Sequence, residues 1–332
     1  MHMALDTDKM SAALRNKSID LAAGRLLITD FRNTEQEKDL TKQPNCGGFG
    51  RIRHFRRHGS PGWPQNPLPI DPAAHKLGYA PGDLLLTQAF QNACCNWRCW
   101  YCFVPFNLLS ANPKHSSWLT PGEILDLYQR EAEQIPVIDL TGGQPDMTPE
   151  WVPWMMREIS KRGLAEKTYL WSDDNLSTDY FWRHLSTEDI NLIRNYRNYG
   201  KVCCFKGFNP DSFVFNTKAE PALYAQQFAL FKRYAELKID IYGYATFTTS
   251  QERGISTDMA DFCDRLQEIS TNLPLRIAPL EVRPFTPTKS RMDVQHEKAL
   301  KLQWSAIECW KSELQRRFDT KLLSAPVWTI SL

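Results

Sequence analysis

The chain of 332 residues carries 40 lysines and arginines against 38 aspartates and glutamates, a formal net charge of +2. This balance gives no overall electrostatic case for nucleic acid as a partner. Apolar residues make up 42% and charged residues 23% of the chain, which is typical of a globular protein. No stretch approaches the roughly 18 apolar residues that span a bilayer, and residues 1–17 carry charges where a signal peptide needs an apolar run. We therefore expect a cytoplasmic protein without a membrane partner.

Residues 1–83 are predicted to form an irregular N-terminal extension. Residues 19–31 fit a short helix and a strand. From Gln43 to Pro81 the chain is rich in Gly and Pro, which are common in turns and rare inside helices and strands. We interpret this segment as an extension that wraps the main domain and not as a second domain.

From Leu84 onward, strand and helix patterns alternate. Strands are predicted at 84–89, 137–140, 168–171, 201–205, 239–246 and 275–282, and helices at 121–133, 149–162, 178–195, 223–237, 258–269 and 294–317. Such alternation indicates an α/β fold with a parallel sheet, because parallel strands need crossover connections. About six units are too few for a closed eight-stranded barrel. We therefore predict an open, partial (β/α)6 barrel over 84–290 and a C-terminal helical segment over 291–332, with ligands at the carboxyl ends of the strands.

A cluster of cysteines follows the first predicted strand of this barrel. Four of the nine cysteines lie between Cys94 and Cys102, and without an export signal they are expected to be reduced. Cys95, Cys99 and Cys102 are separated by three and two residues, so their thiolates can wrap one face of a metal cluster. Soft thiolates suit an iron–sulfur cluster or zinc. A structural zinc site would need a fourth ligand, whereas three ligands leave one iron of a cluster open to a substrate. Cys94 is adjacent to Cys95 and is expected to point elsewhere.

This spacing, with Tyr101 just before the third cysteine, resembles the signature of the radical S-adenosylmethionine (radical SAM) superfamily. The resemblance spans about 84–290. It implies a [4Fe-4S] cluster on Cys95, Cys99 and Cys102 whose open iron binds S-adenosylmethionine. It also implies reductive cleavage of that molecule to a 5'-deoxyadenosyl radical, and an electron donor such as flavodoxin or ferredoxin. By the same resemblance, Tyr101 lies near the adenine.

Two further motifs add to the resemblance. Gly142, Gly143 and Gln144 follow the second predicted strand and resemble the family's glycine-rich motif, which holds the amino group of the methionine moiety. Glycines let the backbone approach a ligand closely, and free carbonyls accept from an ammonium group. Gln144 departs from the commoner Glu because it carries no charge. Lys206 ends the fourth strand and resembles a family lysine that lies near the methionine carboxylate.

Polar residues at other strand ends are candidates for the rest of the site. Asp173 and Asn175 follow the third strand and are predicted to accept from ribose hydroxyls or from the substrate, unless they only cap the next helix. The candidates for contact with the substrate are Asp174, Tyr244, Glu281 and Arg283. Glu281 and Arg283 share a strand face, and a structural ion pair between them is the alternative.

The final substrate is left open by these motifs. A small molecule or nucleoside is one hypothesis, and a protein is another, because Lys206-Gly207 resembles glycyl-radical activating enzymes. RNA or DNA is a third, suggested by a basic stretch with interleaved aromatic residues: Phe49, Arg51, Arg53, Phe55, Arg56, Arg57 and Trp63. A solvated arm, or contacts to an anionic substrate, explains the same stretch. A binding protein stabilised by zinc or by a cluster is the non-enzymatic alternative.

Overall fold

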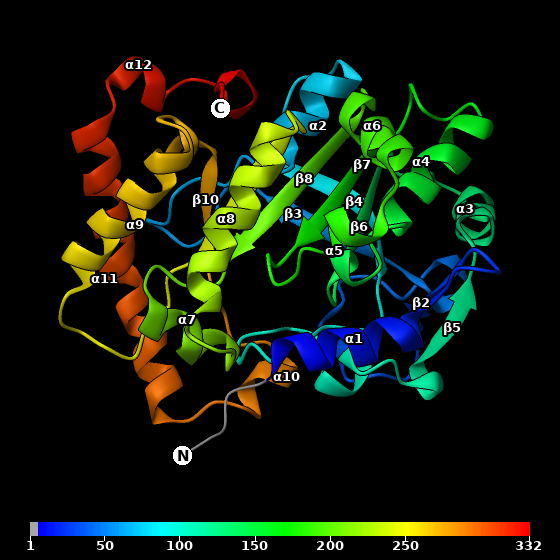
Figure 1. The fold of residues 1–332 in the computed structure, drawn as a ribbon, viewed down its shortest axis with the longest axis horizontal. Coiled ribbons are helices and arrows are strands. Elements are labelled where there is room, and N and C mark those ends of the chain that lie inside the picture. Colours follow the sequence, from blue (N-terminus) through cyan, green and yellow to red (C-terminus); the bar gives the residue numbers. More distant parts are fainter. Residues whose placement is uncertain (1–5) are drawn as a thin grey trace.

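The computed structural model describes residues 6–332, and a curled seven-stranded sheet lies at its centre (Figure 1). Its spatial order is β10-β9-β8-β7-β6-β4-β3, and only β3 runs antiparallel to its neighbour. The strands of this sheet are β3 (Gly50–Arg56), β4 (Leu84–Gln91), β6 (Val137–Thr141), β7 (Tyr169–Asp174), β8 (Tyr199–Phe205), β9 (Ile241–Thr246) and β10 (Ile277–Leu280). From β4 to β10 each parallel strand pairs with the next one along the chain, which confirms the predicted partial barrel.

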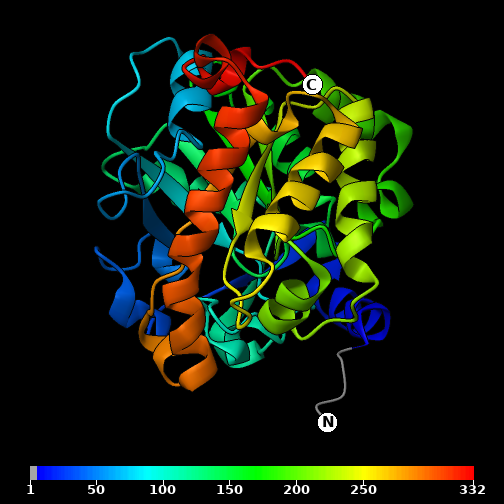
Figure 2. The same ribbon diagram turned by 90° about the vertical axis from the view of Figure 1, so that its left-hand side faces the viewer.

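The helices that follow β4 cover the outer face of this sheet or lie at its ends. They are α3 (Pro121–Arg130), α4 (Trp151–Lys161), α5 (Tyr180–His184), α6 (Thr187–Asn195), α7 (Pro210–Thr217), α8 (Leu223–Glu236), α9 (Ile255–Ile269), α10 (Thr286–Lys289), α11 (Val294–Arg317) and α12 (Thr320–Leu323). Figure 2 shows α8, α9 and α11 side by side along one flank. Outward residues such as Leu140, Phe205 and Ala245 pack with these helices in one apolar core.

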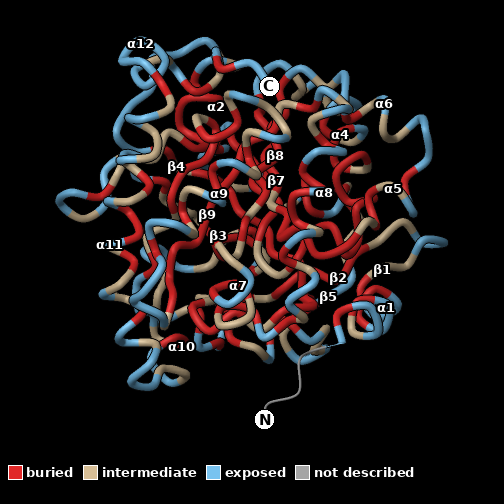
Figure 3. Tube along the Cα trace, turned by 60° about the vertical axis from the view of Figure 1, so that its left-hand side comes forward, coloured by how far each residue is buried: buried red, intermediate tan, exposed pale blue. Residues whose placement is uncertain are grey.

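The amino end of the half-barrel is closed by a plug. Helix α2 (Ile70–Leu77) and a turn at Val327–Thr329 contact each other there. Ile70 and Val327 join one apolar cluster with Tyr169 and Tyr242, which lie on the inner face of the sheet. Figure 3 shows the central strands buried along their length. Only the carboxyl end of the barrel is therefore left for a site, as the strand alternation predicts.

The N-terminal extension is more regular than predicted. It contains α1 (Thr7–Ser18), the strands β1 (Ile19–Asp20) and β2 (Arg25–Thr29), and the strand β3 that completes the main sheet. β1 and β2 form a small sheet with β5 (Ser116–Leu119), which follows the cysteine loop. The pattern of β3 hides it in the sequence, because arginines occupy inward positions where a half-buried strand normally carries apolar side chains. The segment thus wraps the barrel and also supplies one wall of it.

Capping residues explain the other differences from the predicted elements. The helix expected over 178–195 is two helices, because Ser186 starts α6 with a capping box to Asp189. Helix α7 was not predicted, although Asn209 and Pro210 supply an N-cap and a first-turn proline. Helix α11 begins after the N-cap Asp293 and matches the predicted 294–317. Within the described residues, no helix is both long and apolar enough to cross a membrane.

Candidate functional site

The cysteine loop leaves β4 at the carboxyl edge of the sheet and is held by neighbouring elements. Helix α7 contributes Asn216, whose backbone oxygen accepts from the Trp100 backbone N–H at 3.2 Å and whose Oδ1 accepts from Trp100 Nε1 at 3.0 Å. Beyond α10, Arg291 donates to the backbone oxygens of Cys102 and Val104 at 2.7 and 2.8 Å. The loop is therefore fixed by segments far apart in the sequence.

Helix α1 holds the other side of the loop. Trp97 Nε1 donates to Thr7 Oγ1 at 3.2 Å, and Asn96 Nδ2 donates to Ser11 Oγ at 2.9 Å. Trp97 and Asn96 are fully buried, so these bonds are shielded from water. In Figure 1, α1, α7 and α10 all lie at the end of the barrel where the strands terminate. The N-terminal extension thus helps to build the site.

The three predicted ligands lie close together in a region poor in water. Burial raises the pKa of the Cys95 and Cys102 thiols and raises that of Cys99 to about 12. The positive charge of Lys206 lowers the pKa of each of the three thiols, which indicates that its ammonium group lies near them. A bound metal centre would favour the thiolate forms further.

The side chains would still have to turn to share one centre. Within residues 6–332, no three His, Cys, Asp or Glu side chains are placed so that they could hold one metal ion as they stand. Cys94, in contrast, points away from the other three cysteines, because its thiol donates to Asn92 Oδ1 at 3.0 Å and packs with Leu14 and Met147. As expected from its position beside Cys95, Cys94 lies apart from the group.

The turn after β6 brings its backbone against the cysteine loop. Gly142 and Gly143 have φ values of +62° and +54°, in the left-handed region that favours glycine. A Cβ on Gly143 would overlap the backbone oxygens of Asn92 and Cys94. No hydrogen bond within residues 6–332 uses the carbonyl oxygens of Gly142 or Gly143. These two acceptors are therefore available to an ammonium group, as the predicted role requires.

Gln144 is used differently from its neighbours. Its buried amide donates to Asp174 Oδ1 at 2.7 Å and accepts from the Asn175 backbone N–H at 2.9 Å. Its own backbone N–H donates to the Cys94 oxygen at 2.7 Å. Gln144 thus connects the ends of β4, β6 and β7, and its side chain does not project into the interior.

Asp174 lies on the outer face of β7, behind this turn. Its Oδ2 accepts from Tyr234 at 3.0 Å and lies 3.8 Å from Lys201 Nζ. Lys201 also donates to both carboxylate oxygens of Asp146, at 2.8 and 2.9 Å. All four side chains are buried. This network explains the uncharged Gln144, since a Glu there would add a third carboxylate around one lysine.

Asp173 points in the opposite direction, into the interior, because successive strand residues face opposite sides. Its Oδ2 accepts from Thr141 and from Arg53 Nη1, the latter at 3.5 Å. Arg53, on β3, also pairs with Asp139 at 3.0 Å. One buried oxygen each on Asp139, Asp173 and Asn175 has no hydrogen-bond partner among the described residues. The interior therefore holds acceptors suited to ligand hydroxyl or amino groups.

Lys206 and Tyr101 lie at the same mouth. The Tyr101 hydroxyl lies 3.0 Å from Thr246 Oγ1 of β9. Burial opposes the charge on Lys206, but the surrounding Cys204, Tyr101 and cysteine-loop thiols raise the pKa of its ammonium group. Asn175 also reaches the loop, since its Nδ2 lies 3.8 Å from Cys95 Sγ. The structure thus brings these three candidates together with the cysteines.

The remaining candidates lie elsewhere. Tyr244 is inside the barrel, but its hydroxyl donates to the Leu68 oxygen at 2.9 Å, at the plug. Glu281 pairs with Arg283 at 2.7 Å and accepts from the Ser60 hydroxyl at 2.6 Å. This is the structural ion pair that the sequence left as an alternative.

Two contributions to the site were not predicted from the sequence. Gln227 of α8 is buried and donates to the backbone oxygens of Asn175 and Cys204, which aligns the ends of β7 and β8. A glutamine inside a helix carries no sequence signal for this role. The second is the direction of the β3 arginines, for which the sequence left nucleic acid binding, a solvated arm and contacts to an anionic substrate open. Arg51 and Arg53 face the interior, and Arg57 pairs with Asp71.

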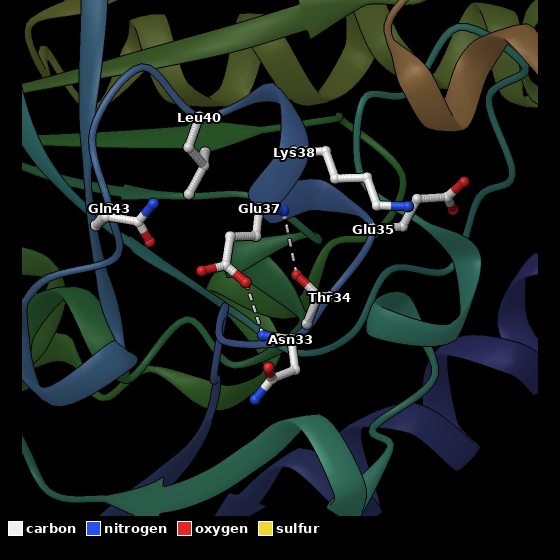
Figure 4. A pocket seen from close by; sticks show the side chains of 7 residues that line it. All are labelled: Asn33, Thr34, Glu35, Glu37, Lys38, Leu40 and Gln43. Atoms are coloured by element: carbon white, nitrogen blue, oxygen red, sulfur yellow. Dashed lines mark hydrogen bonds between the residues drawn. The ribbon is translucent and has the colours of Figure 1, made fainter.

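A surface hollow is separate from this site. It has a volume of about 750 Å³ and is formed by one continuous segment (Figure 4). Its lining residues are Asn33, Thr34, Glu35, Glu37, Lys38, Leu40 and Gln43. None of the cysteine-loop or strand-end residues lines it, so we assign the chemistry to the mouth of the barrel.

No protein-family model and no curated protein matches the sequence. Among solved structures, the chain is similar to SuiB of Streptococcus suis bound to the precursor peptide SuiA, with 14% identity and a TM-score of 0.38 over 53% of this chain and 36% of that one. A second structure, SuiB bound to S-adenosylmethionine, gives 14% identity and a TM-score of 0.36 over 52% and 36% of the two chains.

A third similar structure is the radical S-adenosylmethionine methyltransferase TsrM of Kitasatospora setae, with cobalamin and a [4Fe-4S] cluster bound. It shows 16% identity and a TM-score of 0.40 over 61% of this chain and 38% of that one. The chain thus spans under two fifths of these three solved chains. The assignment of an activity therefore depends on the residues of this chain itself.

The close contact at Gly143 predicts a large effect of Gly143→Ala. A methyl group there meets two backbone oxygens that cannot move without displacing the cysteine loop. We expect a loss of about 3 kcal/mol or more in the free energy of unfolding, measured by urea denaturation. Gly163→Ala is the control, since Gly163 has a φ of +69° but nothing within 4 Å of its Cβ position, and it should lose only about 1–2 kcal/mol. Equal losses would contradict the close approach.

The network behind the turn predicts a compensating pair of substitutions. Gln144→Glu should destabilise the protein by about 3–5 kcal/mol at neutral pH, because it places an uncompensated carboxylate beside Asp174. Adding Asp174→Asn exchanges the amide and the carboxylate and should recover most of that loss. Thermal and urea unfolding of the single and double variants measure the coupling. Strictly additive losses would show that the two side chains do not interact.

Asp139 predicts a pH dependence of stability. Burial raises its pKa to about 7, against the opposing effect of Arg53. In the unfolded chain the carboxyl ionises near pH 4. The native state therefore holds the extra proton between about pH 4 and 7, and the free energy of unfolding should fall as pH rises across that window.

Urea denaturation from pH 4.5 to 7.5 tests this effect. Asp139→Asn should reduce the decrease in the free energy of unfolding across this range by up to a few kcal/mol. Asp83→Asn is the control, since the Asp83 side chain is 80% exposed, and it should leave the slope unchanged. A slope that Asp139→Asn does not alter would contradict the assignment.

Proposed function

We propose that this protein is a radical SAM enzyme that holds a [4Fe-4S] cluster through Cys95, Cys99 and Cys102 and binds S-adenosylmethionine beside it. The observation that carries the proposal is the meeting of three thiols, two buried and that of Cys102 half-buried, with the Gly142-Gly143 turn at the carboxyl edge of a partial parallel barrel. When bound, the cluster supplies the electron that cleaves a carbon–sulfur bond of S-adenosylmethionine to give a 5'-deoxyadenosyl radical.

The donor set fits an iron–sulfur cluster better than structural zinc. Three soft thiols lie near one another, and the next cysteine along the chain, Cys94, is bonded to Asn92 and packed in a separate apolar cluster. A structural zinc site is closed by a fourth protein ligand. Three ligands leave one coordination position open, which a cluster that binds its own substrate requires.

The chain's own residues supply contacts for each part of S-adenosylmethionine. The unpaired carbonyls of Gly142 and Gly143 accept from its ammonium group, and Lys206 pairs with its carboxylate. Asp173 and Asn175 each offer a buried oxygen that has no partner in the described part of the chain, which suits the ribose hydroxyls. Tyr101, held by Thr246, packs near the adenine. Gln144 acts through its neighbours, because it positions Asn175 and the turn.

The surroundings of the loop exclude water from this centre. Trp97 and Trp100 are at most 2% exposed, and their indole N–H groups are bonded to Thr7 and Asn216. Exclusion of water protects a reactive radical from side reactions. The fixed loop also holds the reacting groups in one geometry, and such positioning lowers the barrier to the reaction.

A small-molecule substrate inside the barrel fits these features better than RNA. Of the arginines that suggested nucleic acid binding, Arg51 is buried and Arg53 and Arg57 are half-buried in ion pairs. Phe55 and Trp63 are also buried. Arg56, the last residue of β3, is the exposed member of that strand's basic residues. A flavodoxin- or ferredoxin-like protein would serve as the electron donor.

Production of 5'-deoxyadenosine tests the proposal. The protein is purified anaerobically, reconstituted with iron and sulfide, and incubated with dithionite and S-adenosylmethionine. We expect wild type to form 5'-deoxyadenosine and Cys99→Ala to form none above background. Cys94→Ala is the matched control, since it removes a thiol from the same loop that points away from the other three, and it should keep the activity of wild type. Equal activity in Cys99→Ala, or a colourless protein that retains only zinc, would overturn the proposal.

A further inference from the structure

Arg51 is a buried arginine without a partner in the interior of the half-barrel. Arg51, Arg53 and Phe55 alternate along β3 and therefore face the same side, and Arg53 reaches Asp139 and Asp173 there. Arg51 is only 5% exposed. Within residues 6–332 its side chain makes no hydrogen bond or ion pair, and its Nε and Nη2 are fully buried without an acceptor.

Such an arrangement is strongly unfavourable unless a ligand completes it. Burial, together with Arg53, lowers the pKa of Arg51 to about 10, so the guanidinium is still charged at neutral pH. Its neighbours are the rings of Phe103 and Phe31, with centroids 5.0 and 5.9 Å from Cζ. Aromatic rings offer a weak cation–π attraction but no acceptor for the guanidinium donors. Asp139 and Asp173 stabilise the charge from a distance, but no acceptor among the described residues bonds to the guanidinium.

The position of Arg51 relates it to the reacting centre. Arg51 is paired with Ala89, near the carboxyl end of β4, whereas Arg53 is paired with Thr87 and lies deeper. Phe103 follows Cys102 directly in the chain. Lys206, in contrast, is the cation whose charge lowers the pKa of all three thiols of the cysteine loop. Arg51 thus lies toward the carboxyl edge of the sheet, next to the residue that follows the last cysteine of the loop.

The charges around Arg51 indicate what a ligand bound there carries. Arg53 bonds to both aspartates, whereas Arg51 feels them only at longer range and has no hydrogen-bond acceptor among the described residues. Asp139 and Asp173 would repel a dianion such as a phosphate monoester. The two unpaired nitrogens, Nε and Nη2, form one edge of the guanidinium, and a carboxylate accepts two parallel N–H bonds from such an edge.

We propose that Arg51 binds a carboxylate of the substrate through Nε and Nη2, beside Phe103. This inference rests on the proposed function, since it makes Arg51 the residue that positions the substrate toward the cysteine loop. It narrows the substrate class to carboxylic acids small enough to enter the half-barrel.

Binding of a simple carboxylate tests the inference without turnover. Propionate is titrated by calorimetry into the reconstituted protein, with inorganic phosphate as the comparator at equal ionic strength. We expect one saturable propionate site in wild type, at least a tenfold loss of affinity in Arg51→Met, and no loss in Arg56→Gln. Arg56 is the matched control because it lies on the same strand but is exposed. Ligand-free Arg51→Met should also melt a few degrees above wild type, because it removes an unpaired buried charge.

Several results would overturn the inference. A lower melting temperature for Arg51→Met, with propionate affinity unchanged, would make Arg51 structural. Tighter binding of phosphate than of propionate would exclude a carboxylate as the preferred group. A tenfold loss of S-adenosylmethionine affinity in Arg51→Met would assign the arginine to the cofactor. Formation of 5'-deoxyadenosine by wild type without substrate tests the proposed function alone. If wild type forms none, the proposed function fails; if it forms the product but propionate does not bind at Arg51, only the present inference fails.

Discussion

The parallel pairing of β4, β6, β7, β8, β9 and β10 is the constraint on which the site depends. Parallel strands in sequential order all end at the same edge of the sheet. Groups that are far apart in the chain therefore lie close together at that edge. The cysteine loop, the glycine turn, Asp173 and Lys206 each lie at the end of a different strand, and each reaches the same mouth. With the amino end plugged by α2 and the chain's C-terminal residues, this mouth is where the half-barrel can receive a ligand.

Buried charge is arranged differently on the two faces of the sheet. On the outer face, Lys201, Asp146, Asp174 and Tyr234 form a network whose members all have partners, and Gln144 connects it to the turn. On the inner face, Arg53 is paired, whereas Arg51 and single oxygens of Asp139, Asp173 and Asn175 have no partner among the described residues. Satisfied groups rigidify a structure, and unsatisfied buried groups mark positions where a ligand completes the bonding. The first network thus supports the site and the second faces the ligands.

The sequence predicted the barrel well because its signals are local. Apolar runs, capping boxes and Gly-Gly turns fix strands and helices within a few residues, and the helix at 294–317 matches its predicted bounds. Side-chain direction at the strand ends was harder to predict. Asp173 and Asp174 are adjacent and chemically alike, yet one faces the interior and the other lies under α8. Only the register of β7 distinguishes them. The same applies to β3, whose inward arginines resemble an exposed basic arm until their pairing with β4 is known.

Electron paramagnetic resonance of the reduced protein is the measurement that tests the central claim most directly. The spectrum is recorded after anaerobic reconstitution and dithionite reduction, before and after addition of S-adenosylmethionine. A cluster on Cys95, Cys99 and Cys102 with an open iron predicts an iron–sulfur signal whose g values shift when S-adenosylmethionine binds. A protein that takes up no iron, or a cluster signal that S-adenosylmethionine leaves unchanged at saturating concentration, would contradict the account.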